Sequence, residues 1–232
     1  MRLNGKIIAI EGTDGSGKQT QTEKLIEKLL SEGYNVYSTS FPNYSSGSSA
    51  PVRMYLNGDM GSAPGDVSAK AASMLFAVDR YVTYKKEFEK LYDRKDTVFV
   101  FDRYTASNII HQGSKLMTES SVDMRKLEDF VYWVNCLEHE ELEIPKADIT
   151  IYLNVPLDYT KALRKDRVNK IDNGTKQDIH ESDDTYLKNC AVTGMCAAKL
   201  LKWDVVECVE SGVMRSIEDI SEEIWKIISN KF

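Results

Sequence analysis

A glycine-rich segment near the start of the chain leaves few folds open to it. Gly12-Thr-Asp-Gly-Ser-Gly17-Lys18 follows directly on the apolar run KIIAI at 6–10 and precedes a segment with helical periodicity at 18–31. This is the Walker A pattern in the strand–loop–helix context that it requires. Its glycines let successive backbone N–H groups turn toward a polyphosphate, and the helix N-terminus adds its partial positive charge. The sequence therefore predicts a phosphate-binding loop made by consecutive residues: Gly12, Thr13, Asp14, Gly15, Ser16, Gly17, Lys18, Gln19 and Thr20.

One position of the loop departs from the pattern. Lys18 is expected to contact the β- and γ-phosphates, and a Ser or Thr directly after it normally holds Mg²⁺. This chain has Gln19 there, with Thr20 one step later. Glutamine can hydrogen-bond a phosphate but is a poor Mg²⁺ ligand, so we expect phosphates, waters and a carboxylate to hold the metal.

Strand-like and helix-like segments alternate along the rest of the chain. Short strands are expected at 6–10, 35–39, 97–102, 147–153 and 203–209. Helices are expected at 18–31, 66–92, 122–142, 157–169, 181–201 and 216–230. This alternation is typical of a parallel sheet covered by helices on both faces, so the fold class is α/β of the P-loop NTPase type. The Ser-, Gly- and Pro-rich stretch at 40–51 is interpreted as a functional loop.

Composition excludes several other classes. The 232 residues suit one large domain, 42% hydrophobic residues can form a core, and disorder is therefore not the main state. The net charge of −6 argues against a general nucleic-acid-binding protein. No apolar run approaches the ~20 residues of a membrane span, and there is no room for a signal peptide before residue 6. The four cysteines form no C-x-x-C pair and are expected to be reduced, which predicts a cytoplasmic protein.

A second cluster of polar residues follows the strand at 97–102. Asp102-Arg103-Tyr104 lies at its carboxyl end, where open α/β sheets bind ligands. Arg103 can hold an acceptor phosphate with two parallel hydrogen bonds, and Asp102 can hold a magnesium-bound water or orient Arg103. A P-loop alone does not separate kinases from GTPases or ATPases. The letters of a guanine motif occur at 169–172, but no buried strand precedes them, so we interpret the match as chance.

Several motifs together resemble one family. GTDGSGK, FPNY at 41–44, LFAVDR at 75–80, DRYTASNIIHQG at 102–113 and the polar segment near 164–186 are similar, in the same order, to the motifs of thymidylate kinases. The resemblance covers nearly the whole chain and implies a single P-loop domain, 1–232, with a small mobile lid at about 157–178. It implies ATP-dependent phosphorylation of dTMP to dTDP with Mg²⁺.

The resemblance also assigns roles to individual residues. Phe76 would stack on thymine and Arg80 would bind a base carbonyl, while Asn108 and Gln112 occupy positions that bind the base edge in different branches of the family. Arg103, helped by Tyr44, would hold the dTMP phosphate, and Asp14 would orient the sugar or the metal. Tyr104 would lie against the sugar. The substrate-binding set is thus Tyr44, Phe76, Arg80, Arg103, Tyr104, Ser107, Asn108, His111 and Gln112.

Other assignments are less direct. His111 stands where many members carry a tyrosine that crowds the sugar 2′ position, so discrimination against ribonucleotides can differ. Because the loop lacks an arginine, the resemblance implies that Arg164 or Arg167 of the lid is the catalytic cation, beside Lys18, Arg103 and Asp14. Candidate metal ligands are Asp14, Asp102 and Glu181.

Two other functions remain open from the sequence. One is a kinase for another pyrimidine nucleoside monophosphate or for a deoxynucleoside. The other is a nucleotide-binding regulatory module that has lost catalysis, which Gln19 and His111 would motivate. The partners expected are ATP and dTMP, without nucleic acid or membrane. The family resemblance implies a homodimer, formed by apolar helix faces within 66–92 and 122–142.

Overall fold

A computed structural model describes residues 3–117, 121–164 and 178–231. Five parallel strands form the central sheet in the order β2-β3-β1-β4-β5. They are β1 (Ile7–Gly12), β2 (Asn35–Ser40), β3 (Thr97–Asp102), β4 (Ile149–Asn154) and β5 (Asp204–Glu207). All six residues of β1 and of β3 are buried, as expected for strands covered on both faces. The predicted α/β class and parallel sheet are confirmed.

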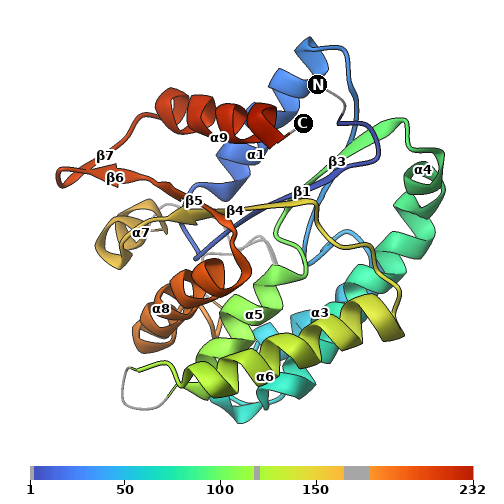
Figure 1. Ribbon diagram of the computed structural model, residues 1–232. Coiled ribbons are helices and arrows are strands. Elements are labelled where there is room, and N and C mark those ends of the chain that lie inside the picture. Colours follow the sequence, from blue (N-terminus) through green and yellow to red (C-terminus); the bar gives the residue numbers. More distant parts are fainter. Residues whose placement is uncertain (1–2, 118–120, 165–177, 232) are drawn as a thin grey trace.

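Helices cover both faces of this sheet (Figure 1). On one face, α1 (Lys18–Ser31) and α9 (Ile217–Lys231) pack on side chains such as Ile8, Ile10 and Val100. On the other face lie α3 (Ala69–Thr83), α5 (Ala106–Gly113), α6 (Met124–Asn135) and α8 (Asp184–Leu201). Successive β1 residues point to opposite faces, so Ile7 and Ala9 join the second core with Phe99 and Phe101.

The remaining elements are short. The α-helices are α2 (Ala50–Leu56), α4 (Glu89–Arg94) and α7 (Leu157–Arg164), and a small antiparallel hairpin is formed by β6 (Val209–Glu210) and β7 (Val213–Met214). Single 3₁₀ turns are η1 (Gly47–Ser49), η2 (Pro64–Asp66) and η4 (Ser114–Leu116). Two π-helical turns, η3 (Tyr84–Phe88) and η5 (Cys136–Glu141), continue α3 and α6.

Three sequence predictions need correction in detail. The helix expected at 66–92 is α3, a π turn and α4, and the helix expected at 122–142 is α6 followed by a π turn. The loop expected at 40–51 holds the 3₁₀ turn η1 and leads directly into α2. All four cysteines are free thiols, and Cys190 and Cys208 are buried. Within the described ranges, no helix combines the length and apolar character needed to cross a membrane.

The strand order places the site. The connection from β1 runs to β2 and β3 on one side, whereas β4 and β5 lie on the other. The direction of the strand order therefore reverses beside β1, and ligands bind at the carboxyl ends of the strands at such a point. The phosphate-binding loop follows β1, and Arg103 follows its neighbour β3.

Candidate active site

The phosphate-binding loop depends on glycines in the left-handed region. Gly15 and Gly17 have φ of 82° and 80°, and Gly17 directly precedes α1 without a side-chain cap. Gly12 has φ of 153°, and a Cβ there would lie 2.5 Å from Ser16 Oγ and 3.0 Å from the Leu153 carbonyl oxygen. The backbone N–H groups of such a loop and of the first turn of α1 point toward the position that an anion would take.

Lys18 lies at the base of this loop. Its side chain is buried, and Nζ donates a hydrogen bond to the Thr13 carbonyl oxygen at 2.7 Å. Gln19 instead points outward, because its Nε2 donates to Glu23 Oε1 at 3.0 Å on the exposed side of α1. The residue that replaces the usual metal-binding Ser or Thr therefore lies outside the cradle. Thr20 is half-buried in the same turn.

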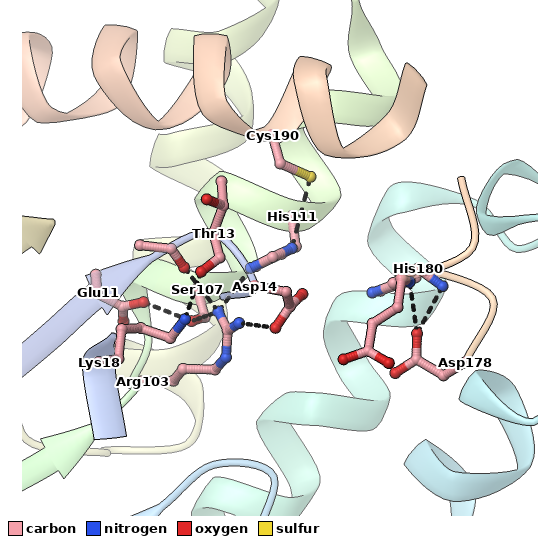
Figure 2. Close-up of polar contacts among 12 residues, drawn as sticks. Glu11, Thr13, Asp14, Lys18, Arg103, Ser107, His111, Asp178, His180 and Cys190 are labelled. Carbon is pink, nitrogen blue, oxygen red and sulfur yellow. Dashed lines mark hydrogen bonds and ion pairs between the residues drawn. The ribbon is translucent and has the colours of Figure 1, made fainter. Parts of the chain in front are cut away.

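Arg103 occupies a tight position at the carboxyl end of β3. Its φ is 70°, a left-handed backbone conformation that is uncommon for a residue with a side chain. Nη2 donates to Asp14 Oδ1 at 2.6 Å, and Nη1 donates to the Gly12 carbonyl oxygen at 3.2 Å. Nη1 also lies 3.4 Å from Ser107 Oγ and 2.7 Å from His111 Nε2 (Figure 2). The structure thus joins Arg103 to the phosphate-binding loop and to α5.

The ion pair between Asp14 and Arg103 controls the charge of both groups. Burial alone would raise the pKa of Asp14, but the nearby Arg103 and Lys18 cations outweigh it and hold that pKa well below its usual range. Burial would likewise lower the pKa of Arg103, but Asp14, Asp102 and Glu11 keep it above its ordinary value. Both groups therefore stay charged across the physiological pH range.

A buried carboxylate holds the turn after β3 in place. Glu11 is fully buried near the end of β1, where Oε1 accepts a hydrogen bond from the Tyr104 N–H at 2.7 Å and Oε2 from Ser107 Oγ at 2.6 Å. Burial raises the pKa of Glu11 although Ser107 and Arg103 oppose the shift. We did not predict Glu11. The signal that could have indicated it is a charged residue at the end of an otherwise apolar, buried strand.

A pocket opens beside Arg103, between α3, α5 and the segment that precedes α8. Of the predicted substrate-binding residues, eight line it: Tyr44, Phe76, Arg80, Arg103, Ser107, Asn108, His111 and Gln112. Asp14, Phe41, Pro42, Leu56, Asp178 and His180 also line it. The Phe76 ring is half-buried and packs edge-on against Tyr55, with centroids 6.3 Å apart. An aromatic wall, several amide and guanidinium groups, and Arg103 at one end suit a flat base joined to a phosphate.

The tautomer of His111 follows from its partners. Arginine only donates, so the Nε2 that faces Arg103 Nη1 accepts, and the ring hydrogen lies on Nδ1, 3.6 Å from Cys190 Sγ. Burial and the Arg103 cation hold the pKa of His111 well below its ordinary value. His111 is therefore a neutral acceptor that orients the Arg103 guanidinium.

The residues that precede α8 close the pocket across from Asp14 (Figure 2). His180 Nε2 lies 2.8 Å from the Tyr55 hydroxyl, and burial together with Lys115 lowers the pKa of His180 to about 3. Burial, with Asp14 and Glu181 nearby, raises the pKa of Asp178 to about 7. We did not predict His180, since a single histidine in a polar segment carries no pattern.

The base-facing end of the pocket contains a buried ion pair. Arg80 Nε donates to Glu138 Oε2 at 2.8 Å and Nη2 donates to Glu138 Oε1, while Asn108 Nδ2 donates to the same Oε1 at 2.7 Å. Glu138 comes from the π turn η5 and is fully buried. We did not predict a carboxylate at this position.

Tyr104 lies elsewhere than predicted. Its ring is fully buried, stacks on Phe101 with centroids 4.9 Å apart, and its hydroxyl donates to the Pro145 carbonyl oxygen at 2.8 Å. It does not line the pocket, so the predicted contact with a sugar is not supported. Tyr104 instead packs in the aromatic core with Phe41 and Phe101, which accounts for its place outside the pocket.

The structure describes only some of the candidate metal ligands and lid cations. Asp102 is buried, and its Oδ1 has no hydrogen-bond partner among the described residues. In the described ranges, no group of three or more His, Cys, Asp or Glu side chains could hold a metal. Glu181 is half-buried, and its N–H donates to Asp178 Oδ1 at 2.8 Å. Arg167 and the side chain of Arg164 lie outside the described residues, as does most of the expected lid.

Comparison with known proteins identifies the family. A family model described as "Thymidylate kinase" matches residues 10–202. The chain belongs to the thymidylate kinase family. It is 31% identical over 180 residues to a thymidylate kinase of Mycobacterium tuberculosis, covering 76% of this chain and 78% of that protein. It is 24% identical over 229 residues to the thymidylate kinase of Schizosaccharomyces pombe, covering 97% and 92%.

A solved structure supports the fold. The thymidylate kinase of Candida albicans superposes with a TM-score of 0.69 at 20% identity, covering 98% of this chain and 92% of that chain. At that identity the likeness concerns the fold. It agrees with the five-stranded parallel sheet and its helical layers.

Proposed function

We propose that this chain transfers the γ-phosphoryl group of ATP to dTMP and forms dTDP. One observation carries the proposal: Arg103, in the acceptor pocket, is hydrogen-bonded to Asp14 and to Gly12 of the phosphate-binding loop. The donor and acceptor sites therefore meet at the ends of two adjacent strands. Membership of the thymidylate kinase family and the named relatives support dTMP as the acceptor.

The transfer needs positioning and charge stabilisation more than covalent help. The loop N–H groups and Lys18 bind the phosphates of ATP, and the Arg103 guanidinium binds the dTMP phosphate in line with them. Asp14 and His111 hold Arg103 in one orientation before substrate arrives. Phe76 covers one face of the base, and Arg80 and Asn108 bind its edge.

The residues at the ends of β1 and β3 fit Mg²⁺. Asp102 Oδ1 is a buried carboxylate oxygen without a partner in the described ranges, and Asp14 lies in the loop itself. Mg²⁺ in phosphate-transfer sites takes one or two carboxylates besides phosphates and waters, so this small set is sufficient. When bound, Mg²⁺ neutralises charge on the β- and γ-phosphates. We propose that Asp102 and Asp14 hold the ion or its waters; Glu181 remains a prediction.

The catalytic role of Arg164 or Arg167 remains a prediction, as do the single domain with a lid at about 157–178 and the cytoplasmic location. A homodimer is also a proposal, supported by an exposed apolar face. Met74, Val78 and Tyr81 are exposed at helical spacing on α3. Tyr132 of the neighbouring α6 is 72% exposed.

The experiment that tests the proposal measures ADP release from ATP and Mg²⁺ with dTMP, dUMP, UMP, CMP, AMP or no acceptor. We expect turnover with dTMP and at least a hundredfold loss of kcat in Lys18→Ala, since a lysine that binds the transferring phosphates supplies several kcal/mol. Lys24→Ala, on the same helix but exposed, is the control and keeps its activity. Binding of ATP without any acceptor-dependent turnover would instead indicate a regulatory nucleotide-binding module.

A further inference from the structure

The buried carboxylate of Glu138 joins the two side chains that face the base. It is the acceptor for Nε and Nη2 of Arg80 and for Nδ2 of Asn108, and no part of it is exposed. The three residues come from α3, α5 and the π turn η5, so distant parts of the chain meet at this one group. Only Arg80 and Asn108 line the pocket, while Glu138 lies behind them.

Glu138 determines which way the Asn108 amide points. Nδ2 carries two hydrogens, and both are used: one is donated to Glu138 Oε1 at 2.7 Å and the other to the Ser73 carbonyl oxygen at 3.1 Å. An ionised carboxylate and a carbonyl oxygen only accept hydrogen bonds. If the Asn108 amide were flipped, its oxygen would face these two acceptors and both hydrogen bonds would be lost. The Asn108 group left for the pocket is therefore Oδ1, an acceptor.

Glu138 also determines what Arg80 offers. One edge of the guanidinium, formed by Nε and Nη2, is bound to the carboxylate, which leaves Nη1 as the terminal nitrogen without an acceptor among the described residues. The pocket thus presents a fixed donor from Arg80 and a fixed acceptor from Asn108. Thymine and uracil offer the complementary pair on adjacent atoms, the N3–H donor and the O4 acceptor. Cytosine offers the reverse pair, since N3 accepts and the 4-amino group donates.

We propose that Glu138 is a positioning residue that determines specificity, fixing the hydrogen-bond polarity of Arg80 and Asn108 so that the site accepts 4-oxo pyrimidines and rejects 4-amino pyrimidines. This inference rests on the proposed function, because it concerns the acceptor base of the same site. A carboxylate suits this task better than a neutral group. It accepts on both oxygens, whereas a glutamine would turn its own NH₂ toward either Arg80 or Asn108.

The burial of this charge is consistent with a task beyond stability. Removing two charges from water is costly, and well-packed apolar residues of similar volume often stabilise a core as well or better. The observed arrangement nevertheless satisfies both carboxylate oxygens with donors from pocket residues. This arrangement gives the pocket a defined pattern of one donor and one acceptor, which a purely apolar core could not provide.

The first test uses the unmodified protein and a matched pair of acceptors. Neither dUMP nor dCMP has the 5-methyl group, so their comparison isolates the polarity of the base edge. We expect kcat/KM to favour dUMP over dCMP by about a hundredfold or more, because the wrong pair leaves buried polar groups unpaired. Dissociation constants of the two nucleotides should show the same order. Equal values for the pair would overturn the inference.

The second test is Glu138→Gln, with Glu140→Gln as control, an exposed glutamate of the same π turn. We expect the dUMP to dCMP ratio to fall about tenfold in Glu138→Gln, because Asn108 can then rotate its amide, and to stay unchanged in the control. A merely structural residue would lower stability and activity with both nucleotides alike. An unchanged ratio in a folded Glu138→Gln would contradict the proposal.

Two further outcomes are distinguishable. If Glu138→Gln does not fold, Asn108→Ala removes the acceptor and must reduce the same ratio about tenfold, and an unchanged ratio again rejects the inference. If the unmodified protein phosphorylates none of the pyrimidine nucleotides, the proposed function fails, and the ratio of dissociation constants still tests the polarity. Turnover of dTMP with an equal preference for dUMP and dCMP rejects the inference and leaves the function standing.

Discussion

Arg103 is the residue at which the donor and acceptor halves of the site meet. Its guanidinium contacts Asp14, the Gly12 carbonyl oxygen, Ser107 and His111, so both terminal nitrogens are held before any phosphate binds. A side chain fixed in this way loses little further freedom on binding substrate. The planar fork also matches two oxygens of one phosphate, which a single ammonium group cannot do.

We therefore expect Arg103→Lys to be severe although it keeps the charge. Loss of the fork should lower kcat/KM for dTMP about a hundredfold, mostly through KM, while the dissociation constant for ATP changes little. Steady-state kinetics and ATP titration measure both quantities. Arg94→Lys, at an exposed arginine of α4, is the matched control. A variant with normal KM for dTMP would remove Arg103 from the acceptor site.

His111 makes stability depend on pH. The folded-state pKa lies well below the ordinary value of 6.5, so between these values the unfolded chain binds a proton that the folded chain does not. Stability is then fully present above about pH 6.5 and is lost as pH falls below that value. In His111→Gln this loss is absent. Denaturant unfolding at pH 8 and pH 5 should show a smaller pH effect in the variant, and equal pH effects in both proteins would contradict the assignment.

At the scale of elements, periodic apolar residues were sufficient to predict the sheet and its long helices. The central strands β1 and β3 are short runs buried on both faces, and α1 and α9 carry apolar residues at helical spacing. The π turns after α3 and α6 were not predicted, because such turns are rare, occur as single turns within α-helices and have no residue pattern of their own. The β6-β7 hairpin is too short to produce a pattern.

Residues of the site can also be divided into those that a sequence pattern predicts and those that it does not. Arg103, Phe76 and Lys18 belong to recognisable sequence motifs. The structure brings them together near the carboxyl ends of β1 and β3. Glu11, Glu138 and His180 could not be found in that way. A charged residue is expected at the surface unless its partner is known, and the partners of Glu138 are 58 and 30 residues away. Only the folded chain shows that these groups are buried and paired.

The packing of α8 on β4 makes a prediction at this scale. A Cβ at Gly194 would lie 2.5 Å from the Tyr152 hydroxyl oxygen and 2.7 Å from the ring. Alanine is favoured over glycine inside a helix, yet here we expect Gly194→Ala to lower the free energy of unfolding by about 1–3 kcal/mol through overlap. Gly65→Ala, where a Cβ has open space, is the control and should change it by less than about 0.5 kcal/mol. Thermal unfolding of both variants measures the difference, and an unaltered Gly194→Ala would show that Tyr152 moves aside freely.

At the scale of the whole molecule, the two faces of the sheet differ in what their helices expose. The helices α1 and α9 cover one face, and α3 lies on the opposite side of the sheet (Figure 1). Met74 and Val78 are 46% and 47% exposed on α3. Lys70 of α3 lies over the Trp133 ring of α6 at 5.0 Å, so the two helices are neighbours, and Tyr132 of α6 is 72% exposed. Exposed large apolar side chains on neighbouring helices are typical of a protein interface.

We expect the protein to be a dimer through this surface. In a two-fold dimer each substitution occurs twice, so Val78→Glu places two like charges in an apolar contact and should weaken association at least a hundredfold. Light scattering coupled to size-exclusion chromatography, at micromolar concentration, should then give twice the chain mass for the unmodified protein and the chain mass for the variant. Leu30→Glu is the matched control, because Leu30 is 55% exposed on α1, away from α3 and α6. Dissociation of both variants alike, or a monomeric unmodified protein, would reject this interface, since Val78 lies within the proposed interface and Leu30 lies outside it.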